Sequence, residues 1–274
     1  MSEENFIDIR KLVQSKSPRL ARLIPGFIYR YLKRILHQDE INDFMRRNGH
    51  LKNEAFCDVI VEEFDLKVEM KGIDHIPAEG GVILVMNHPL GGMDAMALVH
   101  ALGAKRTDIK FIVNDLLLNL TPLQELFVGV NKHGSNERQL HMQMTELFSS
   151  DAAIGIFPAG LVSRRKNGKI ADLEWKKTFV RYARRNNKTI VPIYIEGRLS
   201  SFFYNLSNFR RFIGIKANIE MLYLSDELYK QKGKRIQFIV GDPIQPDALK
   251  NSKSDEEVAQ DIKATVYQLK EQRR

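Results

Sequence analysis

Short apolar runs alternate with helical stretches along most of the chain beyond residue 50, and this alternation constrains the fold more than any other feature. The runs are rich in Val and Ile, as is typical of strands covered on both faces of a sheet. Strands are predicted at Leu66–Lys71, Val82–Asn87, Ile109–Val113, Val128–Asn131, Ala153–Phe157, Thr189–Ile195, Asn218–Tyr223 and Arg235–Val240. Helices are predicted at about 94–103, 122–127, 136–149, 174–187, 225–231 and 255–271. The pattern predicts an α/β domain with a mixed, largely parallel sheet flanked by helices.

The first 60 residues follow a helical pattern instead. We therefore expect two parts: an N-terminal helical, membrane-facing segment at residues 1–60 and an α/β domain at residues 61–274. Within the first part, apolar residues recur at i, i+3 and i+4, and they are Leu20, Leu23, Ile24, Phe27, Ile28, Tyr31, Leu32, Ile35 and Leu36. Pro25 is expected to kink or restart this amphipathic helix.

The polar face of this helix is basic, with Arg19, Arg22, Arg30, Lys33 and Arg34. An apolar stripe beside a basic face suits a helix that lies in the headgroup layer of an anionic bilayer. The alternative is an ordinary surface helix that packs its apolar stripe against its own protein. Periodicity alone favours this second interpretation.

The net charge of +8 is concentrated in two blocks. Residues 10–47 hold ten basic and three acidic side chains, and residues 164–188 hold ten and two. Residues 48–163 are acidic overall, with eight basic and fifteen acidic side chains. Such blocks point to an anionic partner. The single cysteine, Cys57, excludes an internal disulfide and is expected to be a buried thiol, and no apolar run approaches the 18 residues of a transmembrane helix. We expect a cytosolic protein that touches a membrane.

The chemistry is predicted at the end of the strand Val82–Asn87. His88 stands where the strand ends, Gly91 and Gly92 allow a sharp turn, and Asp94 begins the next helix. A carboxylate that holds one imidazole nitrogen leaves the other free to act as a base. The alternative is structural, because Asp94 is also a good helix N-cap and a histidine in a turn is often structural.

Three further blocks have the same character. One strand ends in Phe157-Pro158-Ala159-Gly160-Leu161-Val162-Ser163 and continues into Arg164-Arg165. Another is the apolar strand Val191–Ile195, and a short helix and strand from Pro122 end on Lys132. In their order and spacing, the four blocks resemble the motifs of the glycerolipid acyltransferase superfamily, typified by lysophosphatidic acid acyltransferase. Asn87-His88 with Asp94 resembles the first motif, Lys132 ends the second, Phe157–Ser163 resembles the third and Val191–Ile195 the fourth.

The chain departs from the family pattern at two motifs. Five residues separate His88 from Asp94 where the family has four, and Ala159 with Leu161-Val162 replaces polar residues of the third motif. Those polar groups are implicated in gripping the glycerol phosphate of the acceptor, so a plain lysophosphatidic acid acceptor is not expected. The wording of the motifs resembles a bacterial, hemolysin-like branch that includes O-acyltransferases completing ornithine or glycine lipids.

The resemblance implies acyl transfer from acyl carrier protein or acyl-CoA to the hydroxyl of a lysolipid, a lyso-amino-acid lipid or a lysophospholipid. His88 would be the general base and Asp94 would orient it. Substrate contacts would come from Asn87, Gly91, Gly92, Lys132, Pro158, Gly160, Ser163, Arg164 and Arg165. No metal and no bound cofactor is implied. The expected partners are an anionic membrane surface and acyl carrier protein, and the expected place is peripheral, on the cytoplasmic face of the inner membrane.

Two alternatives remain from the residues. A hydrolase could use the same dyad to activate water, although the Gly-x-Ser-x-Gly turn of such enzymes is missing. A non-enzymatic protein could bind membranes or nucleic acid through the basic blocks. Nucleic acid is not expected as a partner. The aromatic residues of the second basic block, residues 164–188, follow the spacing of a helical core stripe; they are Trp175, Phe179 and Tyr182.

Overall fold

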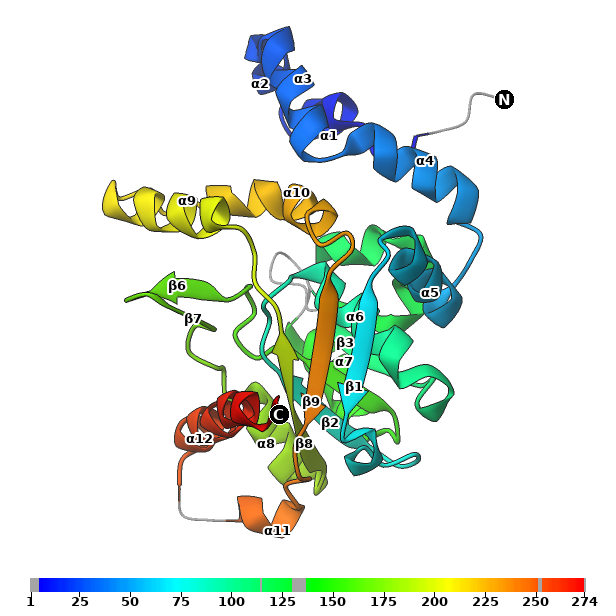
Figure 1. Cartoon of the computed structure of the whole chain (residues 1–274), viewed down its shortest axis with the longest axis vertical. Helices are drawn as coiled ribbons and strands as arrows, with labels where there is room; N and C mark the ends of the chain where they lie inside the picture. Colours follow the sequence, from blue (N-terminus) through cyan, green and yellow to red (C-terminus); the bar gives the residue numbers. More distant parts are fainter. Residues whose placement is uncertain (1–4, 114, 130–136, 251–252, 274) are drawn as a thin grey trace. The chain divides into compact units, whose positions relative to one another are not determined.

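The structure is a computed structural model that describes residues 5–113, 115–129, 137–250 and 253–273 (Figure 1). The chain forms two compact units. The helical unit comprises residues 1–51 and 200–232, and the α/β unit comprises residues 52–199 and 233–274. The sequence analysis expected one boundary, after residue 60, whereas α5 (Asn53–Glu63) lies wholly in the α/β unit and residues 200–232 lie with the N-terminal helices.

The helical unit contains short helices: α1 (Ile9–Lys16), α2 (Pro18–Leu23), α3 (Gly26–Ile35), α4 (Gln38–Asn48), α9 (Ser201–Phe212) and α10 (Leu224–Tyr229), with a 3₁₀ helix at Ile219–Tyr223. The predicted break at Pro25 is present, because this residue separates α2 from α3 with an extended backbone. Contacts between its two chain segments hold the unit together. Tyr31 and Tyr223 share a hydrogen bond of 2.6 Å, and His37 stacks on Tyr229 at 3.9 Å between ring centroids.

The α/β unit is built on a seven-stranded sheet of order β1-β9-β8-β2-β5-β3-β4. Its strands are β1 (Lys67–Lys71), β2 (Val82–Met86), β3 (Lys110–Val113), β4 (Phe127–Gly129), β5 (Ala153–Ile156), β8 (Thr189–Glu196) and β9 (Arg235–Val240). All described strand pairs of this sheet are parallel except β8 with β9. The predicted α/β class with a mixed, largely parallel sheet is therefore confirmed.

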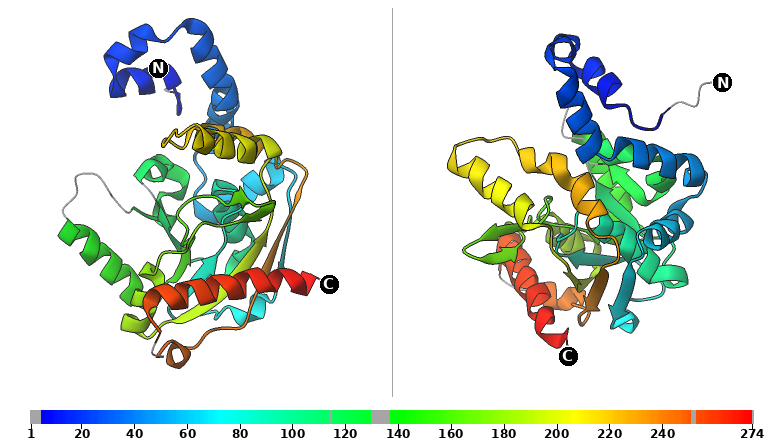
Figure 2. Two further views of the ribbon diagram at one scale, coloured as in Figure 1. Left: turned by 90° about the vertical axis from the view of Figure 1, so that its left-hand side faces the viewer. Right: turned by 45° about the horizontal axis from the view of Figure 1, so that its top comes forward.

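Helices cover this sheet: α5, α6 (Gly92–Leu102), α7 (Glu137–Ser149), α8 (Thr178–Asn186), α11 (Pro246–Leu249) and α12 (Asp255–Gln268). Short 3₁₀ helices lie at Ile73–His75, Gly103–Lys105, Asp115–Asn119, Thr121–Leu126 and Leu269–Arg273. In the views of Figure 2, α12 (red) runs along one side of the sheet. The lone cysteine, Cys57 of α5, is buried as expected, and its burial raises the pKa of the thiol to about 12.

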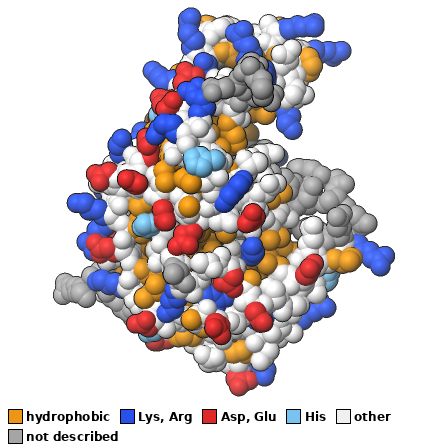
Figure 3. Space-filling model, turned by 90° about the vertical axis from the view of Figure 1, so that its right-hand side faces the viewer, with side chains coloured by type: hydrophobic (Ala, Val, Ile, Leu, Met, Phe, Trp, Pro, Cys, Tyr) orange, Lys and Arg blue, Asp and Glu red, His pale blue; other side chains and the backbone are white. Residues whose placement is uncertain are grey.

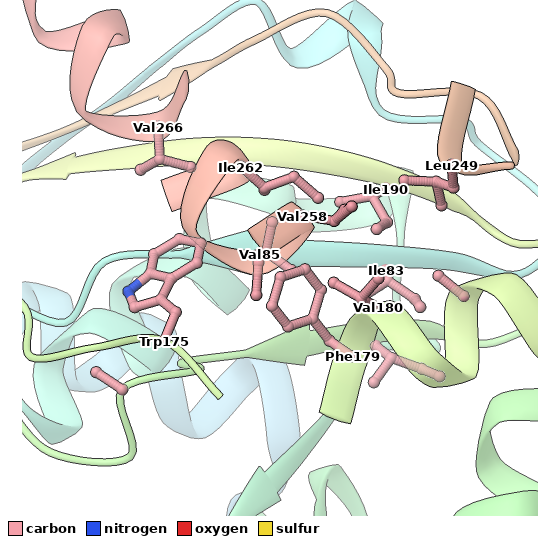
Figure 4. Close-up of a cluster of buried hydrophobic side chains, with 14 of the residues drawn as sticks. Ile83, Val85, Trp175, Phe179, Val180, Ile190, Leu249, Val258, Ile262 and Val266 are labelled. Atoms are coloured by element: carbon pink, nitrogen blue, oxygen red, sulfur yellow. The ribbon is translucent and has the colours of Figure 1, made fainter. Parts of the chain in front are cut away.

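One hydrophobic cluster joins the sheet to α7, α8 and α12. Ile83 and Val85 of β2 meet Phe179 and Val180 of α8 in this cluster, and Trp175 lies beside them (Figure 4). Between Ile83 and Val85, Leu84 is also fully buried, so β2 is covered on both faces as its apolar run predicted. The cluster fixes the central strand whose carboxyl end carries His88.

Three segments differ from the sequence prediction. Asn218–Tyr223, predicted as a strand, contains the 3₁₀ helix Ile219–Tyr223, in which Glu220 turns inward to pair with Arg210. Residues 164–171, where neither a strand nor a helix was predicted, form the hairpin β6 (Arg164–Lys166) and β7 (Lys169–Ala171). No helix was predicted at α9, whose last turn leaves apolar side chains exposed and so lacks a clean amphipathic pattern.

Candidate active site

The loop that leaves β2 brings His88 and Asp94 together. The Nδ1 atom of His88 lies 2.9 Å from Oδ2 of Asp94, which sits in the first turn of α6. Gly91 makes the fold-back possible, because its φ of 73° and ψ of −137° are open to glycine but strained for a residue with a Cβ. The spacing of five intervening residues is therefore compatible with a direct hydrogen bond. Since Nδ1 is engaged, Nε2 is the nitrogen left to meet a substrate.

The carboxylate of Asp94 is fully buried. Its Oδ2 also accepts the backbone N–H of Leu90 at 2.9 Å, and its Oδ1 has no hydrogen-bond partner within the described part of the chain. Burial raises the pKa of Asp94, while the hydrogen bond and positive charge of His88 work in the opposite direction. Asp94 thus depends on His88 for its charge balance, as His88 depends on Asp94 for its orientation.

The His88 ring is positioned from its other side by β5. It stacks on Phe157, with 4.1 Å between ring centroids and 27° between the planes, and 18% of the His88 side chain remains exposed. Phe157 directly follows β5, so the parallel pairing of β2 with β5 places both rings at the same edge of the sheet. A base held by Asp94 and Phe157, with part of its side chain exposed, suits proton transfer to or from a bound substrate.

A second buried carboxylate, Asp172, supports the His88 loop, a role that no sequence pattern indicated. Its Oδ1 accepts the backbone N–H of His88 at 3.2 Å and the hydroxyl of Ser163 at 2.6 Å. Its Oδ2 accepts the indole N–H of Trp175 at 2.9 Å. Asp172 follows the unpredicted hairpin, 84 residues after His88, so no local spacing could have revealed the contact.

The backbone of Asp172 is held by α12. Its N–H donates to the hydroxyl of Tyr267 at 2.7 Å, and its carbonyl accepts the Lys263 ammonium at 2.9 Å. Burial raises the pKa of Tyr267, so this phenol stays protonated. The C-terminal helix is thereby linked to the His88 loop through a chain of hydrogen bonds.

Asn87, expected to contact substrate, has its side-chain amide occupied by the protein. Its Nδ2 donates to the carbonyl of Ile195 at 2.9 Å, and its Oδ1 accepts the Ile195 N–H at 2.7 Å. This pair links the carboxyl ends of β2 and β8. The position of Asn87 is therefore that of a residue that fixes the strand end before His88.

The segment Phe157–Ser163, which resembles the third motif, lies around His88 and Asp94 and contacts the His88 loop through its backbone. The N–H of Ser163 donates to the His88 carbonyl at 2.8 Å. Pro158 is buried, and its carbonyl accepts the N–H of Lys176 at 3.1 Å. Gly160 is exposed in a turn with φ of 67°, close enough to Lys176 that an added Cβ would lie 3.2 Å from its ammonium. Lys176, which the sequence analysis did not single out, adds a cation beside the glycine turn.

The two expected arginines lie in β6 and differ in exposure. Arg164 is 95% buried, and its guanidinium donates to the Val162 carbonyl at 2.7 Å, whereas Arg165 is half-buried. Gly91 is buried and Gly92 is exposed at the start of α6. Lys132, the basic residue expected from the second block, lies outside the described residues. No group of three His, Cys, Asp or Glu side chains placed to hold a metal ion occurs within the described ranges.

The structure places a His–Asp pair at the carboxyl edge of an α/β sheet, and comparison of the sequence with known families identifies the class of protein. The family described as "Acyltransferase" matches residues 11–273. The chain therefore belongs to the acyltransferase family, which confirms the resemblance found from the motifs and sets aside the non-enzymatic alternative. Together with the two relatives described next, this match identifies it as an O-acyltransferase.

Two curated relatives are similar over nearly the whole chain. A lyso-glycine lipid O-acyltransferase of Phocaeicola vulgatus is 42% identical over 265 residues, which cover 96% of this chain and 95% of the relative. A protein of the same name from Bacteroides thetaiotaomicron is 43% identical over 265 residues, covering 96% and 97%. Among solved structures, the 1-acyl-sn-glycerophosphate (LPA) acyltransferase PlsC from Thermotoga maritima aligns with a TM-score of 0.49 and 15% identity, over 88% of this chain and 95% of that one.

Within the described part of the chain, no helix combines the length and the apolar character that crossing a bilayer requires.

Proposed function

We propose that this protein transfers a fatty acyl group from a thioester, carried by acyl carrier protein or coenzyme A, to the hydroxyl group of a lyso-glycine lipid. The observation that carries the reaction is the 2.9 Å contact between His88 Nδ1 and the buried Asp94 carboxylate at the carboxyl edge of the sheet. The observation that supports the acceptor is the likeness to two lyso-glycine lipid O-acyltransferases over 96% of the chain.

The reaction would proceed in two proton transfers. Nε2 of His88 takes the proton of the acceptor hydroxyl as its oxygen attacks the thioester carbonyl carbon. Asp94 accepts the Nδ1–H and stabilises the imidazolium that forms. When the tetrahedral intermediate collapses, the C–S bond breaks and the thiolate takes the proton from His88, which leaves an ester and a free thiol. General-base assistance of this kind contributes about 10²- to 10⁴-fold to the rate.

The third block supports an acceptor without phosphate. Ala159 and Val162 are apolar and buried where the family carries polar groups for a glycerol phosphate. A glycine headgroup offers a single carboxylate, for which one cation is a sufficient partner. We propose Lys176, exposed beside Gly160, as this cation.

We also propose that the enzyme works as a peripheral protein on anionic lipid, at the cytoplasmic face of the inner membrane, with acyl carrier protein as a donor partner. The basic block at residues 10–47 supports this proposal. In Figure 3, Lys and Arg side chains project from the N-terminal helices with hydrophobic side chains between them. Removing residues 1–47 should weaken the binding of the protein to anionic vesicles, and unaltered binding would return the predicted helix to a packing role.

The experiment that separates transferase from hydrolase is thioester turnover with and without acceptor. Purified protein is given acyl carrier protein or coenzyme A carrying a labelled acyl chain, together with lyso-glycine lipid, lysophosphatidic acid or no acceptor. We expect thiol release that depends on lyso-glycine lipid and a product heavier by one acyl group. Equal thiol release without acceptor would favour the hydrolase, and a strong preference for lysophosphatidic acid would contradict the proposed acceptor.

A further inference from the structure

Exposed apolar side chains are concentrated in the helical unit. Of the 14 large hydrophobic residues that are exposed among the described residues, 11 belong to residues 1–51 and 200–232. The same residues carry 15 basic and nine acidic side chains, so six of the eight net positive charges lie in this unit. A surface that is both apolar and basic is unusual for a protein that meets only water.

The most exposed of these residues, Phe212, lies at the end of α9, far in sequence from the predicted N-terminal helix, and exposed apolar residues surround it. We call Phe209, Phe212, Ile213 and Ile215 the apolar tip; their exposures are 58%, 88%, 49% and 38%. Residues 211–218 form an unbroken exposed run. In Figure 1, the C-terminal end of α9 (yellow) and the chain that follows it form one end of the pair of helices α9 and α10.

The apolar tip has a defined conformation. Gly214, with φ of 78°, ends the helix, and the Ile215 N–H bonds back to the Arg210 carbonyl at 2.8 Å. In helix ends of this kind the apolar residue after the glycine usually packs on the helix, which would hide it. Here the side chain of Ile215 remains exposed instead.

A buried ion pair holds the loop in place. The guanidinium of Arg210 pairs with both oxygens of Glu220, including a contact of 3.0 Å from Nη2 to Oε1, and its Nη1 donates to the Ile215 carbonyl at 3.1 Å. Glu220 is fully buried and Arg210 is 94% buried. Desolvating such a pair is costly. This buried ion pair therefore holds the loop between Arg210 and Glu220 in a conformation that leaves the apolar tip exposed.

The charge around the apolar tip selects its partner. Residues 200–219 contain three basic residues and no acidic residue, and Arg211 and Lys216 are exposed beside the apolar side chains. A second copy of this surface would bring like charges together, whereas anionic headgroups would neutralise them while the acyl chains receive the apolar side chains.

We propose that the apolar tip inserts into the headgroup and acyl boundary of an anionic bilayer, as a second membrane contact separate from the basic helix at the N-terminus. The proposal rests on the proposed function, because a lipid acceptor is reached at a membrane. Its chemistry is that of a lipid surface: apolar side chains enter and flanking cations stay at the headgroups.

The test is partitioning of the full-length protein onto vesicles of phosphatidylcholine with phosphatidylglycerol. Phe212→Ser should weaken partitioning about 30-fold, since burial of a Phe side chain from water contributes about 2 kcal/mol. Lys216→Gln should weaken it about fivefold, and only on vesicles that contain the anionic lipid. Leu173→Ser is the matched control, because Leu173 is 41% exposed in the α/β unit, and it should leave partitioning unchanged.

Activity separates this proposal from the proposed function. With acceptor dispersed in detergent, Phe212→Ser should retain the wild-type rate, and with acceptor in vesicles it should lose rate in step with binding. A wild-type protein that forms no product in either format would contradict the proposed function. The partitioning measurement would still decide the membrane contact. Unchanged partitioning of Phe212→Ser, or a change in oligomeric state without lipid, would overturn the membrane contact.

Discussion

Asp172→Asn tests whether the buried carboxylate beside the dyad positions His88. Asp172 accepts three hydrogen bonds, from the His88 N–H at 3.2 Å, the Ser163 hydroxyl at 2.6 Å and the Trp175 indole at 2.9 Å. Asparagine keeps one acceptor oxygen and replaces the other with a donor. If the oxygen stays toward His88 and Ser163, the amide group faces the Trp175 N–H, and both donors lack an acceptor.

The expected loss of stability follows from that single bond. A hydrogen bond to a charged group contributes about 1.5–3 kcal/mol, so Asp172→Asn should lower the free energy of unfolding by about 2–3 kcal/mol. Trp175→Phe removes the donor of the same bond. In a double-mutant cycle measured by urea denaturation, Asp172→Asn should therefore cost less in the Trp175→Phe background by about 1.5–3 kcal/mol.

The kinetic effect distinguishes positioning from stability alone. A misplacement of the base by about 1 Å can cost 10²-fold, so kcat should fall by about 10- to 100-fold with little change in KM. The negative charge of Asp172 also contributes to the raised pKa of Asp94, so the acidic limb of the pH profile should move to lower pH in the variant. A coupling below about 0.5 kcal/mol, or a wild-type kcat and pH profile in the folded variant, would refute the reasoning.

Two further predictions concern the same loop. Burial raises the pKa of Asp94 above 3.8, so the folded protein binds this proton more tightly than the unfolded chain and its unfolding free energy falls as pH rises through the raised pKa. Asp94→Asn should thus become more stable relative to wild type as pH rises in urea titrations, and a pH-independent difference would contradict the burial argument. Gly197→Ala would place a Cβ 2.7 Å from Cγ of the buried Leu90, so thermal or urea denaturation should show a loss of about 1–3 kcal/mol together with a lower kcat. Gly26→Ala, whose Cβ would meet nothing within 4 Å and whose φ, like that of Gly197, is not positive, is the control, and an equal loss there would contradict the clash with Leu90 as the cause.

The sequence was most informative where local patterns control structure. Apolar runs such as Val82–Met86 identified the central strands, and the strand-end position of His88 with two following glycines indicated where the chain would turn. Both depend on neighbours within about ten residues, which is the range that hydrophobic periodicity and turn chemistry cover.

The rest depends on contacts between distant segments. Asp172 reaches His88 across 84 residues, and the Arg210–Glu220 pair turns the predicted strand at Asn218–Tyr223 into a 3₁₀ helix. Asn87 had the appearance of a substrate contact because it precedes His88, yet its amide is paired with Ile195, 108 residues later. Tertiary hydrogen bonds determine the structure at these positions, and local secondary-structure propensity does not predict such bonds.

Acyl transfer by His88→Ala is the most direct measurement of the central claim. With labelled acyl thioester and lyso-glycine lipid in detergent, the folded variant should lose about 10²- to 10⁴-fold in kcat while its circular dichroism and melting temperature stay near those of wild type. His50→Ala, which removes an exposed histidine from the helical unit and not from the α/β unit, serves as the active control in the same assay. A folded His88→Ala protein that forms product within about tenfold of the wild-type rate would contradict the assignment of His88 as the general base.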